Sequence, residues 1–148
     1  MNTIKLLALL MAFLVIISSS VLSCAHKELS DNKAEKWLLQ FIGETKGTVD
    51  LSLKRKQIAN DTYSVAGSFQ GMVSDHLGGD GRIECTLSGH LSGNAFQVRI
   101  SGTGNMARTV DLNGVMRGKI DQFHGSGSYI VMHQEGSSKG TWVMKIIQ

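Results

Sequence analysis

Residues 86–104 read TLSGHLSGNAFQVRISGTG, and this stretch decides the fold. Apolar residues occupy every second position up to the turn-forming segment Ser92-Gly93-Asn94, and Phe96, Val98 and Ile100 resume the same spacing after it. A period of two is typical of a half-buried β-strand, and a connection this short makes the two strands antiparallel. The stretch therefore predicts a β-hairpin with one apolar face.

The same period continues through most of the chain from Gly47 onward, and residues 111–128 repeat the hairpin pattern faintly. The 17 glycines and the absence of proline fit strands that bend often. We expect an all-β fold, an antiparallel up-and-down meander of seven or eight strands that closes into a barrel and so removes its exposed edges. A two-sheet β-sandwich and a membrane-spanning barrel are the alternatives.

Local signals place the connections between these strands. Residues 36–43 fit either a helix or an eighth strand, because their apolar residues satisfy both periods. The longest connection is expected at residues 71–82, GMVSDHLGGDGR, a candidate lid or binding loop that carries Asp75, His76, Asp80 and Arg82. Other turns are expected at five sites. These are Ala59-Asn60-Asp61, Ser92-Gly93-Asn94, Gly102 to Asn105, Arg117-Gly118 and Glu135 to Gly140.

The first 24 residues have the layout of an export signal that ends in a cysteine. An unbroken apolar run from Leu6 to Ile17 follows Lys5, and it is shorter than the roughly 20 residues of a membrane-spanning helix. The segment Val21-Leu22-Ser23-Cys24 resembles the lipobox of bacterial lipoproteins, although Leu22 stands where a smaller residue is commoner. This resemblance implies cleavage before Cys24 and its lipidation with acyl chains such as palmitate. Ala25, in place of aspartate, implies sorting to the outer membrane, facing the periplasm or the cell surface.

The resemblance divides the chain into a signal peptide (1–23), a lipidated cysteine with a polar tether (24–35) and a single β-domain (36–148). Removal of the signal peptide lowers the formal net charge from +3 to +2, which argues against nucleic-acid binding and gives only a slight attraction to anionic lipid. With lipid on Cys24, Cys85 has no disulfide partner. It lies between Ile83 and Leu87, so we expect a small core residue rather than a nucleophile.

The region after the tether resembles the calycin-like barrels, the lipocalins and avidins, in its early Trp37, its short hairpins and the closing Gly140-Thr141-Trp142. The lipocalin Gly-x-Trp signature belongs near the first strand, so no binding residue is carried over. The interior of such a barrel is either filled or holds one small molecule. Glycines expected on the apolar faces relieve crowding or clear room for a ligand; they are Gly67, Gly89, Gly114, Gly125 and Gly127. Candidate ligand contacts are Trp37, Phe69, Phe96, Phe123, Tyr129 and Trp142.

The sequence indicates no catalytic site, metal site or cofactor. His90 and His124 fall on polar faces, and neither an H-E-x-x-H nor a usable G-x-S-x-G motif occurs. We expect a non-enzymatic, membrane-anchored binding module for a small apolar or amphipathic molecule. The alternative is an envelope structural or interaction lipoprotein with a filled barrel, whose partner is a protein or the cell wall.

Overall fold

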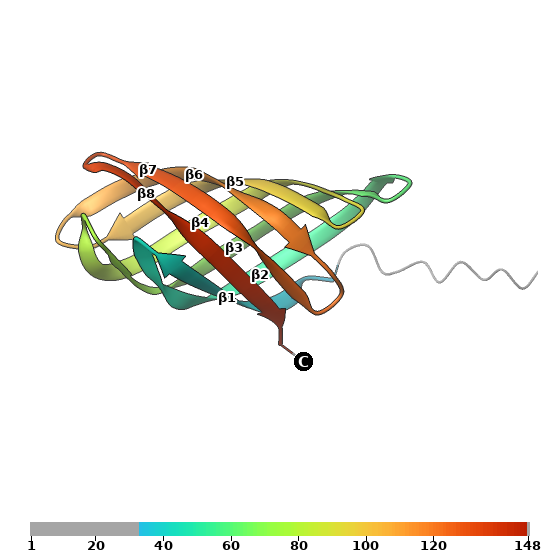
Figure 1. Cartoon of the computed structure of the whole chain (residues 1–148), viewed down its shortest axis with the longest axis horizontal. Helices are drawn as coiled ribbons and strands as arrows, with labels where there is room; N and C mark the ends of the chain where they lie inside the picture. Colours follow the sequence, from blue (N-terminus) through green and yellow to red (C-terminus); the bar gives the residue numbers. More distant parts are fainter. Residues whose placement is uncertain (1–32, 148) are drawn as a thin grey trace, which may run out of the picture.

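The computed structural model describes residues 33–147, which form one closed antiparallel barrel (Figure 1). Each strand pairs with the next, and the last pairs with the first, so the expected closed meander is confirmed and the sandwich is wrong. The strands are β1 (Glu35–Gly43), β2 (Thr45–Ala59), β3 (Thr62–Asp75), β4 (Gly79–Ser92), β5 (Ala95–Asn105), β6 (Thr109–Ile120), β7 (His124–His133) and β8 (Gly136–Ile146).

The ambiguous residues 36–43 belong to strand β1. Trp37, Leu39 and Phe41 are buried at every second position, and the strand pairs with β2 on one side and β8 on the other. The strand pattern prevails over the helical one because both neighbouring strands offer partners for its backbone groups. Eight strands, rather than seven, therefore complete the barrel.

Several predicted connections are wrong because the strands run through them. Gly102 to Asn105 ends β5, Arg117-Gly118 lies within β6, and residues 136–140 begin β8. The long loop at 71–82 is also wrong, because β3 and β4 remain paired as far as Asp75 and Gly79, which leaves only residues 76–78 as the turn. Gly118 and Gly140, which are turn signals in the sequence, are strand residues that lie against the rings of Trp142 and Tyr129.

The apolar faces of the strands point into the barrel, and the polar faces point outward. This is the reverse of a membrane-spanning barrel, which is apolar outside. Among residues 33–147 no helix is long and apolar enough to cross a membrane.

The barrel has two different ends. One, the terminal end, holds the start of β1, the end of β8 and the turns β2–β3, β4–β5 and β6–β7. The opposite end, the far end, holds the other four turns. Figure 1 shows the terminal end at the right of the view.

Large aromatic side chains fill the interior toward the terminal end. Trp37 and Trp142 are fully buried, and Phe96 packs edge-on against Trp142 with ring centroids 5.6 Å apart. Both indole N–H groups have acceptors, because Trp142 Nε1 donates to the Ser128 carbonyl at 3.0 Å and Trp37 Nε1 donates to Glu35 at 3.1 Å. The paired N–H groups let both rings be buried without an unsatisfied donor.

A pair of glycines makes room for Trp142. Gly118 and Gly127 are directly paired across β6 and β7, and Gly127 is paired with Trp142 across β7 and β8. A Cβ atom on Gly118 would lie 2.7 Å from both the Gly127 Cα and the Trp142 ring, closer than real Cβ contacts. At this position the crowding interpretation of the inner glycines holds, because the missing side chains are replaced by a neighbour's ring.

We expect Gly127→Ala to lower the free energy of unfolding by about 1–3 kcal/mol, because its Cβ would collide with the Gly118 backbone. The matched control is Gly104→Ala. Its Cβ would meet only side-chain atoms, the nearest at 3.3 Å on Val110, and the change should be close to neutral. Urea unfolding followed by tryptophan fluorescence measures both values, and equal losses would contradict this account of the glycine pair.

Candidate functional site

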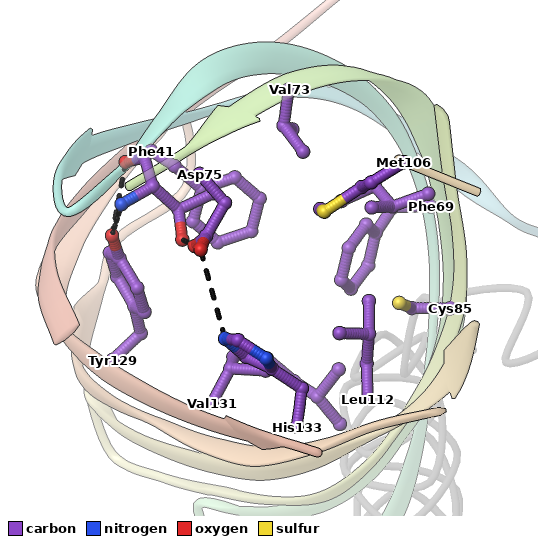
Figure 2. Close-up of a pocket in the computed structure, with 13 residues that line it drawn as sticks. Phe41, Phe69, Val73, Asp75, Cys85, Met106, Leu112, Tyr129, Val131 and His133 are labelled. Atoms are coloured by element: carbon purple, nitrogen blue, oxygen red, sulfur yellow. Dashed lines mark hydrogen bonds and ion pairs between the residues drawn. The ribbon is translucent and has the colours of Figure 1, made fainter. Parts of the chain in front are cut away.

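A small apolar cavity lies inside the barrel toward the far end. Residues from seven strands and one turn line it. Figure 2 shows labelled members of this lining pointing into the lumen. The volume of the cavity is about 30 Å³, which is room for about two water molecules. Its wall is mostly apolar, formed by Phe41, Phe69, Val73, Ile83, Cys85, Ile100, Met106, Leu112 and Val131, and its polar lining residues are Thr45, Asp75, Tyr129 and His133.

Asp75 is the central polar residue at this end, and it is 6% exposed. Its Oδ2 accepts a hydrogen bond from the Thr45 hydroxyl at 2.7 Å, and its Oδ1 accepts from the backbone N–H groups of Leu77 and Gly78 at 3.0 and 3.3 Å. Burial alone raises the pKa of Asp75, but hydrogen bonds from Ser138, Thr45 and those two N–H groups outweigh it and lower the pKa. The carboxylate therefore ties β2 and β8 to the β3–β4 turn.

Two histidines lie beside this carboxylate. His133 Nε2 is 3.7 Å from Asp75 Oδ1, and His76 Nδ1 is 3.8 Å from the same oxygen. Both rings also approach the Ser138 hydroxyl at 3.4 Å. Since the Glu135 backbone N–H donates to His133 Nδ1, the neutral ring carries its proton on Nε2, which faces Ser138 and Asp75. We call Thr45, Asp75, His76, His133 and Ser138 the polar cluster.

The polar cluster does not have the order of a catalytic triad. In a triad the carboxylate and the serine contact opposite nitrogens of the histidine, whereas here Asp75 and Ser138 both face Nε2 of His133. Ser138 is also only 1% exposed. In residues 33–147 no three His, Cys, Asp or Glu side chains are grouped for metal binding. The geometry suits hydrogen bonding that holds the end of the barrel together.

Tyr129 supports the rim of the cavity from β7. Its hydroxyl donates to the Thr45 carbonyl at 3.0 Å and accepts from the Thr45 N–H at 2.9 Å, while its ring packs edge-on against Phe41. Gly140 leaves space for this ring, because a Cβ there would lie 2.8 Å from the Tyr129 hydroxyl. Tyr129 thus links β7 to the start of β2, across the β8–β1 pair that closes the barrel.

Met106 covers part of the cavity from the β5–β6 turn. Its side chain reaches into the lumen (Figure 2) and passes close to Gly78 and Gly81, where an added Cβ would collide with it. Its turn is attached to the β7–β8 turn by an exposed ion pair between Arg108 and Glu135. Exposed ion pairs contribute little, and methionine is flexible, so Met106 is the wall residue that moves at least cost.

The predicted ligand contacts fall into three groups. Phe69 and Tyr129 line the cavity, whereas Trp37, Phe96 and Trp142 lie outside its lining and fill the barrel nearer the terminal end. Phe123 was expected on an inner face, and this is wrong. It lies in the β6–β7 turn before β7 begins and is 51% exposed.

The four candidate residues of the predicted 71–82 loop lie in two different places. Asp75 and His76 belong to the polar cluster, but Asp80 and Arg82 are exposed on the outer face of β4, where Arg82 contacts Gln70 and Glu84. Cys85 is buried as expected, and burial raises the pKa of its thiol to about 12, so it is protonated at neutral pH. His90 and His124 are exposed on polar faces, as predicted.

Sequence reasoning missed Thr45, His133, Ser138 and Met106. Thr45 and Asp75 are 30 residues apart, and His76 and Ser138 are 62 apart. A serine or histidine at an inward position of a strand is the one available signal, since polar residues on an apolar face need partners. Cys24 and the signal segment lie outside the described residues. Comparison of the chain with family models, curated proteins and solved structures finds no match.

The lowered pKa of Asp75 predicts a specific loss of stability in acid. The pKa of Asp75 in the folded protein is below the ordinary 3.8. Its contribution to the free energy of unfolding is therefore fully present above pH 3.8 and is lost as the pH falls through the folded pKa. We expect Asp75→Asn to reduce the free energy of unfolding by about 2 kcal/mol at pH 7 and progressively less below pH 3.8. Denaturant unfolding at a series of pH values measures this difference.

Asp80→Asn is the matched control, because Asp80 is exposed on the outside of β4. It should change the stability little at any pH. A constant difference between Asp75→Asn and the unmodified protein down to the acid transition would contradict the role given to the Asp75 carboxylate.

Proposed function

We propose that this protein is a lipid-anchored envelope protein whose barrel binds the apolar part of a small amphipathic molecule at the far end. The observation that supports binding is the apolar cavity beside the polar cluster, since small-molecule sites combine a mainly apolar wall with a few placed polar groups. Thr45, Asp75 and His133 supply polar atoms at the cavity, and Phe69, Ile100 and Leu112 supply apolar wall.

The size of the cavity limits the ligand. Room for about two waters accepts only a very short apolar group, so a longer one requires displacement of Met106. The charge of the surroundings limits the head group. The half of the barrel toward the far end carries seven acidic and four basic residues, which favours a neutral or cationic head group over a carboxylate.

The lipid anchor is proposed from the lipobox resemblance of Val21 to Cys24. Cys24→Ala should leave an uncleaved precursor and abolish incorporation of radioactive palmitate, because the thiol is the site of acylation. Expression in a bacterial host with labelled palmitate measures both. Normal processing of the variant would contradict the lipoprotein assignment while leaving the cavity proposal intact.

Ligand binding is tested by native mass spectrometry on the chain from Ala25 to Gln148, which contains the whole closed barrel, followed by titration with matched alkylamines and fatty acids. We expect a discrete extra mass that is lost on denaturation, and tighter binding of the alkylamine than of the fatty acid. Met106→Ala should strengthen binding by about tenfold, because about 1–2 kcal/mol of displacement and packing cost is removed. Val131→Phe should weaken binding because it fills the cavity.

The outcome that contradicts this function is an absence of any bound mass together with no response to Met106→Ala. It would favour the second candidate, an interaction lipoprotein with a filled barrel. The outer faces of β6 and β7 support that candidate, because Val115 is paired with Ile130, and Ile130 and Met132 are 40% and 54% exposed.

A further inference from the structure

The charges of the barrel are divided between its two ends. Cutting each strand near its middle gives a terminal half of residues 33–38, 53–68, 86–100, 115–128 and 141–147. This half carries nine Lys and Arg against three Asp and Glu, a net charge of +6. The remaining described residues carry four Lys and Arg against seven Asp and Glu, a net charge of −3.

The basic residues lie on the outside of the terminal half, and we call this set the basic belt. They come from five of the eight strands and from the residues just before β1, in one group on β8, β1 and β2 and another on β5 and β6, so positive charge lies on two sides of this end. Arg55 is paired with Glu35, which leaves the other members to project from the wall. The members are Lys33, Lys36, Lys54, Arg55, Lys56, Arg99, Arg117, Lys119 and Lys145.

Exposed apolar side chains accompany the basic belt at the tip. Phe123 is 51% exposed in the β6–β7 turn, and Ile147, just after β8, is 43% exposed. The Phe123 carbonyl accepts from the Ile146 N–H, and the Ile147 N–H donates to the Lys36 carbonyl. The exposed side chains are therefore adjacent to the point where the chain enters and leaves the barrel.

The turn that presents Phe123 is well fixed. Asp121 Oδ1 accepts hydrogen bonds from the backbone N–H groups of Phe123 and His124 at 2.8 and 2.7 Å, and its own N–H donates to the His124 carbonyl. The aromatic ring is held in an exposed position by a local network that does not depend on core packing.

We propose that the terminal end is a docking surface for an anionic phospholipid bilayer, in which the basic belt contacts the head groups and Phe123 enters the interface. Basic residues near an anionic surface and an aromatic residue at the head-group level are the recognised elements of such binding. Charge complementarity favours this occupant, and Lys33, which precedes β1, adds to the positive charge of the same end. The surface belongs to the barrel itself, so docking requires neither lipid on Cys24 nor an occupied cavity.

The test uses the chain from Ala25 to Gln148 without lipid and measures co-sedimentation with vesicles. One set is phosphatidylcholine alone, and the other is an equal mixture of phosphatidylcholine and phosphatidylglycerol. We expect binding to the anionic vesicles only, weakening as salt is raised because the charges are exposed. Absence of binding to the anionic vesicles, or equal binding to both kinds, overturns the proposal.

Two charge-reversal pairs test the orientation. Lys56→Glu with Lys119→Glu alters the basic belt, and Lys46→Glu with Lys139→Glu makes the same change in net charge at the far end; all four side chains are exposed. Each basic residue at the surface is worth about fivefold in partitioning, so the first pair should weaken binding about 25-fold or more. The second should have much less effect. Equal losses would show attraction by net charge alone and overturn the proposed orientation.

Phe123→Ser tests the apolar contribution to vesicle binding. Its control is Leu77→Ser, because Leu77 is also exposed but lies in the β3–β4 turn at the far end. Only the first should reduce binding. Since no variant in this series lines the cavity and the chain used carries no lipid, a negative result leaves both the ligand proposal and the lipid anchor standing.

Discussion

The pairing of β8 with β1 is the constraint on which the rest of the structure depends. Seven residue pairs, from Trp37 with Ile146 to Gly43 with Gly140, join the first strand to the last. Closure gives each strand two partners, so no edge is left for aggregation. It also fixes the volume of the interior and places the start of β1 beside the end of β8.

The interior within this closed wall is stabilised in two different ways. Toward the terminal end the rings of Trp37, Phe96 and Trp142 occupy the space, and the glycine pair of β6 and β7 admits the last of them. Toward the far end the side chains leave a small cavity, and the polar cluster around Asp75 joins β2, β8 and the β3–β4 turn. At this end hydrogen bonds accompany the aromatic contacts of Phe41 with Phe69 and Tyr129, because a buried carboxylate must have its oxygens satisfied.

The period of two predicted the strands, their direction and the buried faces, because alternation depends only on local geometry. It failed wherever the answer depended on a partner strand. Gly118 suggested a turn in the sequence, yet it lies within β6 because Trp142, 24 residues later, occupies the space above it. The expected loop at 71–82 was wrong for the same reason, since pairing of β3 with β4 extends the strands. The alternation in the sequence also included Phe123, which lies one residue before β7 begins.

Net charge was equally uninformative until the strands were placed. A formal charge of +3 indicates little affinity for any polyanion, but it is the sum of a positive end and a negative end. Long-range electrostatics depends on where charges lie, and a polarised molecule orients at a charged surface even when its total charge is small. Under the two proposals the basic end lies on the bilayer and the cavity lies toward the opposite end, which faces the aqueous phase. A molecule that enters the cavity therefore arrives from the aqueous phase, and its apolar part must be small enough to dissolve there.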